Sequence, residues 1–274
     1  MGEQTAISWT DHTFNPWWGC WKIADECKHC YADDLANRYA KGLWGRTAPR
    51  RFFGDKHWNE PRKWNRKAAK DGVRRRVFVG SMCDWAEIHV DAYTNREMDV
   101  ARDRLFALIR ECPDLDWLLL TKRPEDARSA LPWCRDGSHD AYANVWIGAT
   151  AGTNESLSRV VPPLREIPAA VRFISCEPLL ERIDANKWDW ALGEGETLAG
   201  IDWLIVGNES GHKRRPADMG WIRIARDAAE RHGVAFHFKQ WVEPDGKKIH
   251  LPVLDGQQWA EFPAIAAAVG TEGK

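Results

Sequence analysis

Six short apolar segments recur along the chain at intervals of about thirty residues. Each is almost continuously apolar, which is typical of a parallel strand buried on both faces. Between them, apolar residues at helical spacing predict helices, most clearly at 92–112 and at 219–233, where Gly233 is placed to end the helix. The predicted strands are 77–82, 116–121, 144–149, 171–176, 202–207 and 235–240.

Alternating strands and helices predict an α/β fold, either a barrel or an open doubly wound sheet. Polar and charged residues follow nearly every predicted strand. A barrel gathers these strand ends around one mouth, whereas an open sheet concentrates functional groups at one switch point. We therefore predict a single domain over 1–274, a partial (β/α) TIM-like barrel of about six to seven parallel strands. A basic insertion near 45–76 and a C-terminal extension near 241–274 stand outside the repeat.

Composition narrows the class of protein. The 274 residues are 44% hydrophobic and 29% charged, with a formal net charge of -1, as in ordinary globular proteins. No apolar run reaches membrane length, and the N-terminus lacks the features of a signal peptide. We therefore expect a cytoplasmic protein without a membrane partner. Thiols stay reduced there, so the seven cysteines are first considered as ligands, reactive groups or core residues.

Three of these cysteines, Cys20, Cys27 and Cys30, fall within eleven residues. They could be unrelated thiols, a zinc site completed by His29 or by a distant residue, or the ligands of an iron–sulfur cluster. Structural zinc sites usually show two pairs of ligands, and the chain has no second C-x2-C or H-x3-H. Three thiolates on a four-iron cluster leave one iron open, which suits catalysis.

A cysteine-rich loop ahead of a series of βα units resembles the radical S-adenosylmethionine (SAM) enzymes. Their commonest spacing is C-x3-C-x2-C, whereas the first gap here is six residues. The resemblance is closer to a family of phage and prophage proteins marked by this three-cysteine motif, and it covers most of the chain. The segments that carry it are "NPWWGC", "FVGSMCD", "LLTKRPE", "FISCEPL", "VGNESG", "FKQW" and "LDGQQWAEFP".

The resemblance implies an incomplete barrel of the radical SAM type, with a [4Fe-4S] cluster held by Cys20, Cys27 and Cys30 on the loop after the first strand. SAM would chelate the open iron, and an external electron donor would trigger its cleavage to a 5′-deoxyadenosyl radical. That radical would take a hydrogen atom from the substrate. The protein would supply placement and exclusion of water.

By position, the resemblance also implies contacts to SAM. His29 would lie near the adenine, and Ser81 and Asp84 would face the amino group, although this loop departs from the Gly-Gly-Glu form common in the superfamily. The remaining candidates lie near the ribose, the carboxylate or the adenine: Thr150, Glu177, Gly207, Glu209 and Ser210.

Three further residues are candidates for catalysis. Cys83 follows a predicted strand and could return a hydrogen atom to a substrate radical, or it could be a small buried hydrophobe. Lys122 follows a predicted strand and Lys239 lies near the end of one, where they could bind a phosphate or carboxylate of the substrate or form ion pairs on the rim.

Segment 45–76 carries twelve Lys and Arg residues against three Asp and Glu, interleaved with aromatic residues. It could bind a nucleic-acid backbone with bases stacked on the aromatic rings, or it could be a solvated helix with buried Trp faces. A second basic cluster follows at 211–216. The candidate nucleic-acid contacts are Arg50, Arg51, Lys63, Arg66, Arg74, Arg214 and Arg215.

The leading hypothesis is thus a radical SAM enzyme acting on a nucleic acid base or nucleotide, in phage DNA modification or repair, within the bacterial host's cytoplasm if phage-encoded. One alternative is a radical SAM enzyme acting on a peptide or small metabolite. Another is a non-catalytic nucleic-acid-binding protein that holds zinc or a cluster. A protein partner is also expected. The sequence does not name the substrate, the reaction outcome or the oligomeric state.

Overall fold

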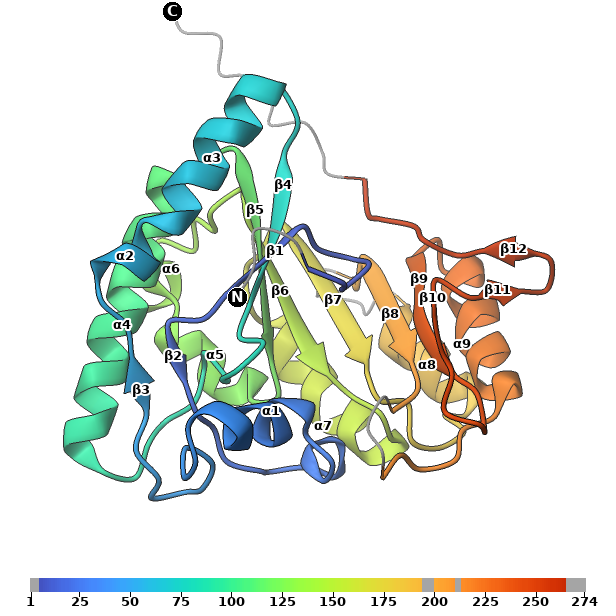
Figure 1. Cartoon of the computed structure of the whole chain (residues 1–274). Helices are drawn as coiled ribbons and strands as arrows, with labels where there is room; N and C mark the ends of the chain where they lie inside the picture. Colours follow the sequence, from blue (N-terminus) through green and yellow to red (C-terminus); the bar gives the residue numbers. More distant parts are fainter. Residues whose placement is uncertain (1–4, 194–199, 210–212, 265–274) are drawn as a thin grey trace, which may run out of the picture.

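The computed structural model describes residues 5–193, 200–209 and 213–264. In this part of the chain, eight strands form one curled, open sheet, and all except the last run parallel (Figure 1). The sheet is a partial α/β barrel. Its order is β1 (His12–Phe14), β4 (Arg75–Val79), β5 (Leu115–Thr121), β6 (Val145–Thr150), β7 (Val171–Cys176), β8 (Trp203–Gly207), β9 (Ala235–Val242) and β10 (Lys248–His250).

Helices cover the convex face of the sheet (Figure 1). They are α2 (Asp55–Trp58), α3 (Glu60–Asp71), α4 (Ala92–Glu111), α5 (Pro124–Ala130), α6 (Pro132–Arg135), α7 (Asn154–Arg165), α8 (Ala185–Leu192) and α9 (Met219–Arg231). The remaining helix, α1 (Tyr31–Tyr39), lies at the carboxyl ends of the strands instead. Two small antiparallel pairs join β2 (Trp17–Trp18) to β3 (Arg51–Phe52) and β11 (Val253–Leu254) to β12 (Gln257–Gln258). No helix in the described residues is long and apolar enough to span a membrane.

The concave face of the sheet changes character along the strands. Its first half is filled by an apolar plug, which includes Trp9, Phe78, Trp146, Phe173 and Trp203. Because side chains two apart share a face, positions two or four residues further along the same strands also face the concave side. Those positions are small or polar and line a cavity: Gly80, Thr150 and Ser175. The plug thus forms the floor of the cavity.

All six predicted strands are confirmed, with small shifts at their ends. The predicted helices correspond to α4 and α9, and Gly233 adopts φ 64° just after α9. β1 has no apolar pattern that would predict it, since "HTF" is short and mostly polar. The basic segment forms β3, α2 and α3, and the C-terminal extension adds β10 to the sheet edge.

We predict that Gly148→Ala destabilises the plug. A methyl group at this position of β6 would overlap the Phe173 ring. Overpacking of this kind costs about 1–3 kcal/mol. Urea denaturation should therefore show a lower midpoint for Gly148→Ala than for Gly200→Ala, where an added methyl group has no neighbour within 4 Å. Equal midpoints would contradict the packing described.

We also predict an acid-side loss of stability that depends on His237. Burial in the concave face lowers the pKa of His237 to about 4, and Ser8 is hydrogen bonded to its Nε2 at 2.9 Å. The folded pKa lies below the unfolded value of about 6.5, so protonation favours unfolding. Stability is fully present above about pH 6.5 and falls by roughly 3 kcal/mol as the pH drops to about 4.

The measurement is the free energy of unfolding against pH for the wild type, His237→Gln and, as control, His139→Gln at an exposed site. The curve for His237→Gln should be flatter than the other two between these pH values. Three parallel curves would show that His237 is not the titrating group.

Candidate active site

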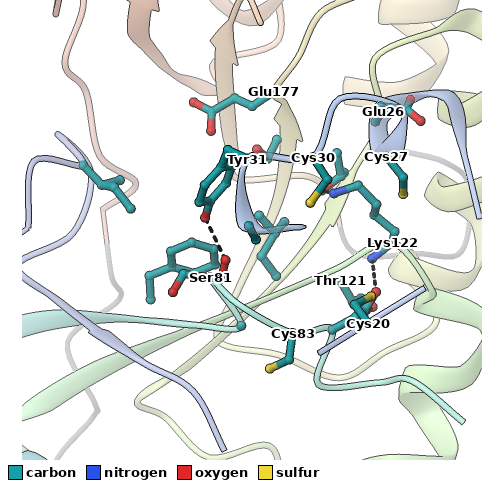
Figure 2. A pocket seen from close by; sticks show the side chains of 18 of the residues that line it. Cys20, Glu26, Cys27, Cys30, Tyr31, Ser81, Cys83, Thr121, Lys122 and Glu177 are labelled. Carbon is teal, nitrogen blue, oxygen red and sulfur yellow. Dashed lines mark hydrogen bonds between the residues drawn. The ribbon is translucent and has the colours of Figure 1, made fainter. Parts of the chain in front are cut away.

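A cavity of about 250 Å³ opens at the carboxyl ends of the parallel strands (Figure 2). Its wall combines the loop from β2 to α1 with the ends of β4, β5, β6, β7 and β9. Four thiols line it, those of Cys20, Cys27, Cys30 and Cys83. The three clustered cysteines therefore lie at the mouth of the partial barrel, among the ends of its strands.

The loop 19–30, here called the cysteine loop, is hydrogen bonded to three neighbouring loops of the barrel. The Glu26 carboxylate accepts a hydrogen bond from the Gly152 N–H at 2.6 Å, beyond β6. Arg215, beyond β8, donates to the Asp25 carbonyl at 3.0 Å, and Arg123, beyond β5, donates to the Trp21 carbonyl at 2.9 Å. These contacts hold the loop across the mouth of the barrel.

Gly19 starts the cysteine loop with a backbone that other residues rarely adopt. Its φ is 115°, and a Cβ there would lie 2.6 Å from the Leu43 carbonyl oxygen. Glycine is therefore required where the chain turns toward Cys20. The turn brings Gly19 beside Cys83, with which it forms a parallel bridge.

A buried ion pair between Asp84 and Arg123 supports the cavity from below, with Nη1 and Oδ2 2.8 Å apart. Asp84 also accepts hydrogen bonds from the Thr121 hydroxyl at 2.6 Å and from the Lys122 N–H at 3.0 Å. Burial alone would raise the pKa of Asp84, but Arg123 and these donors hold it below its usual value. Asp84 is therefore a carboxylate in the folded protein.

Lys122 and Arg123 bring positive charge to the thiols. The guanidinium of Arg123 lies 3.8 Å from the Cys20 sulfur. Burial alone would lower the pKa of Lys122, but the nearby Cys27 and Cys30 raise it above its usual value. Figure 2 shows the Lys122 side chain extending toward these two cysteines. Burial and Asp84 raise the pKa of Cys20 to about 12, so its thiol is protonated in this arrangement.

The chemical character of the residues around Cys20, Cys27 and Cys30 is compatible with an iron–sulfur cluster. Three thiols open into one cavity, and two cations lie next to them to offset the charge of thiolates. In the described part of the chain, however, no three His, Cys, Asp or Glu side chains are close enough together to hold a metal ion. Ligation by Cys20, Cys27 and Cys30 therefore requires their side chains to turn toward a common centre.

The predicted SAM contacts separate into two groups. Ser81, Asp84, Thr150 and Glu177 line the cavity. His29 and Glu209 bond to each other, Nδ1 to Oε2 at 3.2 Å, and neither side chain lines this cavity. Gly207 also lies away from it, packed against Gln240, and Ser210 lies outside the described residues.

Two predicted catalytic lysines also line the cavity, but both already have partners. Lys122 donates to the Thr150 hydroxyl at 3.4 Å, and Lys239 forms an ion pair with Glu177 at 2.6 Å. Cys83 is 9% exposed, and burial raises the pKa of its thiol. It is thus a protonated thiol at the cavity wall, which both of its predicted roles allow.

The structure corrects part of the nucleic-acid prediction. Arg50 is fully buried, pairs with Glu87 and donates to the Ala48 carbonyl, so its guanidinium cannot reach a nucleic acid. The aromatic residues of the basic segment mostly serve packing: Trp64 stacks on His12 and Trp58 contacts Phe14, both in the core. The rings of Trp58 and Trp64 are therefore not available to stack on bases.

Most other predicted nucleic-acid contacts also have partners within the protein. Arg74 pairs with Asp116, Lys63 with Glu60 and Arg215 with Glu209. Arg51 lies over the Trp18 ring, Arg214 donates to the Glu243 carbonyl, and Arg66 is exposed on α3. The C-terminal end of α3 lies at the top of Figure 1, at the opposite end from α1 and the cysteine loop.

A protein-family model matches residues 4–263, almost the whole chain. The family is described as proteins of unknown function (DUF5131). This chain belongs to DUF5131. No curated protein and no solved structure matches it significantly.

In this DUF5131 protein, several cavity residues were missed from the sequence. Lys248 and His250 lie on β10, a short strand whose sequence has no apolar pattern that would predict it. Ser175 lies inside the predicted strand 171–176, and the sequence suggested no role for it. Glu26 lies between two of the clustered cysteines and was given no role from the sequence. In the structure its carboxylate is buried and hydrogen bonded, so it has a structural role.

We predict that Glu26→Ala loosens the cysteine loop of this DUF5131 member. A hydrogen bond to a charged group contributes about 1.5–3 kcal/mol, so local opening should become roughly tenfold or more frequent. The rate of iodoacetamide modification at Cys27 and Cys30, measured by mass spectrometry, should rise accordingly.

Cys112, which is fully buried in the main core, is the internal reference for this experiment. Glu155→Ala, at an exposed position of α7, is the matched control and should leave the rates unchanged. If Glu26→Ala also leaves them unchanged, Glu26 does not hold the loop.

Proposed function

We propose that this protein is a radical SAM enzyme that acts on a nucleotide or nucleic acid base. One observation carries the proposal: the thiols of Cys20, Cys27 and Cys30 line a single cavity at the mouth of a partial α/β barrel. A [4Fe-4S] cluster with bound SAM supplies one-electron cleavage of a sulfonium and abstraction of a hydrogen atom. A purely structural metal site would have no need of an adjoining cavity lined with charged groups.

The residues of the chain have three tasks in this proposal. The cysteine loop presents the thiols, and its anchors through Glu26 and Arg123 fix it over the strand ends. Lys122 and Arg123 stabilise thiolates by their charge. The apolar plug below the cavity keeps water away from its floor, which favours a reactive species that water would quench.

A nucleotide or base is proposed because lysines line the cavity, and Ser81, Thr150 and Gln240 in the same wall can form hydrogen bonds. Lys122 and Lys239 are the proposed substrate contacts, since an ammonium group binds phosphate. The exposed face of α3 is not part of this proposal, because its basic residues lie at the far end of the sheet from the cysteine loop (Figure 1).

We predict that anaerobic loading with iron and sulfide gives a brown protein with about four irons per chain. Under a strong reductant, this protein should convert SAM to 5′-deoxyadenosine. Cys20→Ala, Cys27→Ala and Cys30→Ala should each lose most of the iron and this activity. Cys134→Ala should keep both, because Cys134 lies on α6 away from the cavity.

The readouts are iron analysis, visible absorbance and chromatography of the nucleoside product. A colourless zinc-containing wild type without SAM cleavage would refute the proposal and leave a metal-binding protein. Iron content that is unchanged in all three cavity variants would refute the ligand assignment.

A further inference from the structure

One wall of the cavity is built by a pair of strands away from the cysteine loop. β9 and β10 are antiparallel neighbours at the edge of the sheet, with His250 opposite Gln240. Lys239, Gln240, Lys248 and His250 from this pair line the cavity. The wall, here called the β9–β10 wall, thus brings three basic side chains to one cavity.

The negative charge near this wall does not balance its basic groups. Glu177 is the carboxylate that pairs with Lys239, and its second oxygen has no hydrogen-bond partner. Among the described residues, Lys248 has no carboxylate within ion-pair distance. Burial and the charge of Lys239 lower the pKa of Lys248, and burial, Lys248 and Lys239 lower that of His250. The basic groups therefore repel one another when no ligand is present.

A neutral group elsewhere in the cavity also lacks a partner. The Ser175 hydroxyl is fully buried, lines the cavity and has no hydrogen-bond partner. A buried polar group without a partner costs about 1–3 kcal/mol, and a ligand oxygen could accept a hydrogen bond from this hydroxyl. The unpaired Ser175 hydroxyl and the basic side chains of the β9–β10 wall can both be satisfied by one type of ligand, an oxyanion.

We propose that the β9–β10 wall is an anion subsite that holds a phosphate or carboxylate group of the substrate. Lys248 and Lys239 bind the anion, and the Ser175 hydroxyl donates to it. Glu177 competes for Lys239 when the subsite is empty. The inference rests on the proposed function only where it calls the occupant a substrate, because the subsite itself needs no iron.

The test measures anion binding by the full chain, both as purified and after iron loading, by isothermal titration calorimetry. The probes are inorganic phosphate, acetate, a nucleoside 5′-monophosphate, the same nucleoside without phosphate, and SAM. Tighter binding of phosphate than acetate assigns the subsite to a phosphate group, and the reverse order assigns it to a carboxylate. The nucleotide should bind more tightly than its nucleoside if phosphate is the recognised group.

Lys248→Gln should weaken binding of the preferred anion by about tenfold, or about 1.4 kcal/mol, because it removes one of the two lysine charges that contact the anion. Lys247→Gln is the matched control: it removes the same charge one residue earlier, at an exposed position that does not line the cavity, and should leave the affinity unchanged. Glu177→Gln should tighten binding, because it frees Lys239, and structural damage would not produce that result.

The inference is overturned if neither phosphate nor acetate nor the nucleotide binds at millimolar concentration. It is also overturned if Lys247→Gln and Lys248→Gln weaken binding equally, or if the anions compete with SAM without responding to Lys248→Gln. If iron loading fails, the proposed function is refuted, but the conclusions drawn from these binding measurements remain valid.

Discussion

The buried ion pair between Asp84 and Arg123 is the contact on which the candidate active site depends. Charges in a protein interior are costly unless each is well hydrogen bonded, and here Asp84 accepts from Thr121 and Lys122 in addition to Arg123. Arg123 in turn donates to the Trp21 carbonyl. One pair therefore joins the loop after β4, the end of β5 and the cysteine loop, and removal of either charge would leave the other buried alone.

The sheet was predictable because its central strands are buried on both faces, and such strands consist of almost continuous apolar residues in the sequence. The polar groups after those runs correctly indicated one shared mouth, and the three cysteines lie there. β1 and β10 were not predicted, because neither consists of a continuous apolar run. They are short, they lie at the sheet edges, and β10 is held by pairing with β9 instead of by apolar side chains.

The partners of charged residues were not predictable, because they depend on distant parts of the chain. Arg50 and Arg51 are adjacent and look alike in the sequence, but one is fully buried against Glu87 and the other is exposed beside Trp18. Trp58 and Trp64 resembled a base-stacking series, but their rings pack against β1. A pattern of residue types thus identifies a basic segment without showing which of its charges remain free.

The arrangement of charge in the cavity follows from the same strand geometry. Consecutive residues at the end of β5 point to different sides, so Arg123 approaches Cys20 while Lys122 reaches toward Cys27 and Cys30. At the other wall, Lys239 and Lys248 come from paired strands, so the β9–β10 pairing fixes the positions of their backbones in the cavity wall. Both positive regions are therefore fixed by backbone pairing before any ligand binds. Because the groups are held in place beforehand, an anion that fits between them would lose little binding energy to rearrangement of the protein.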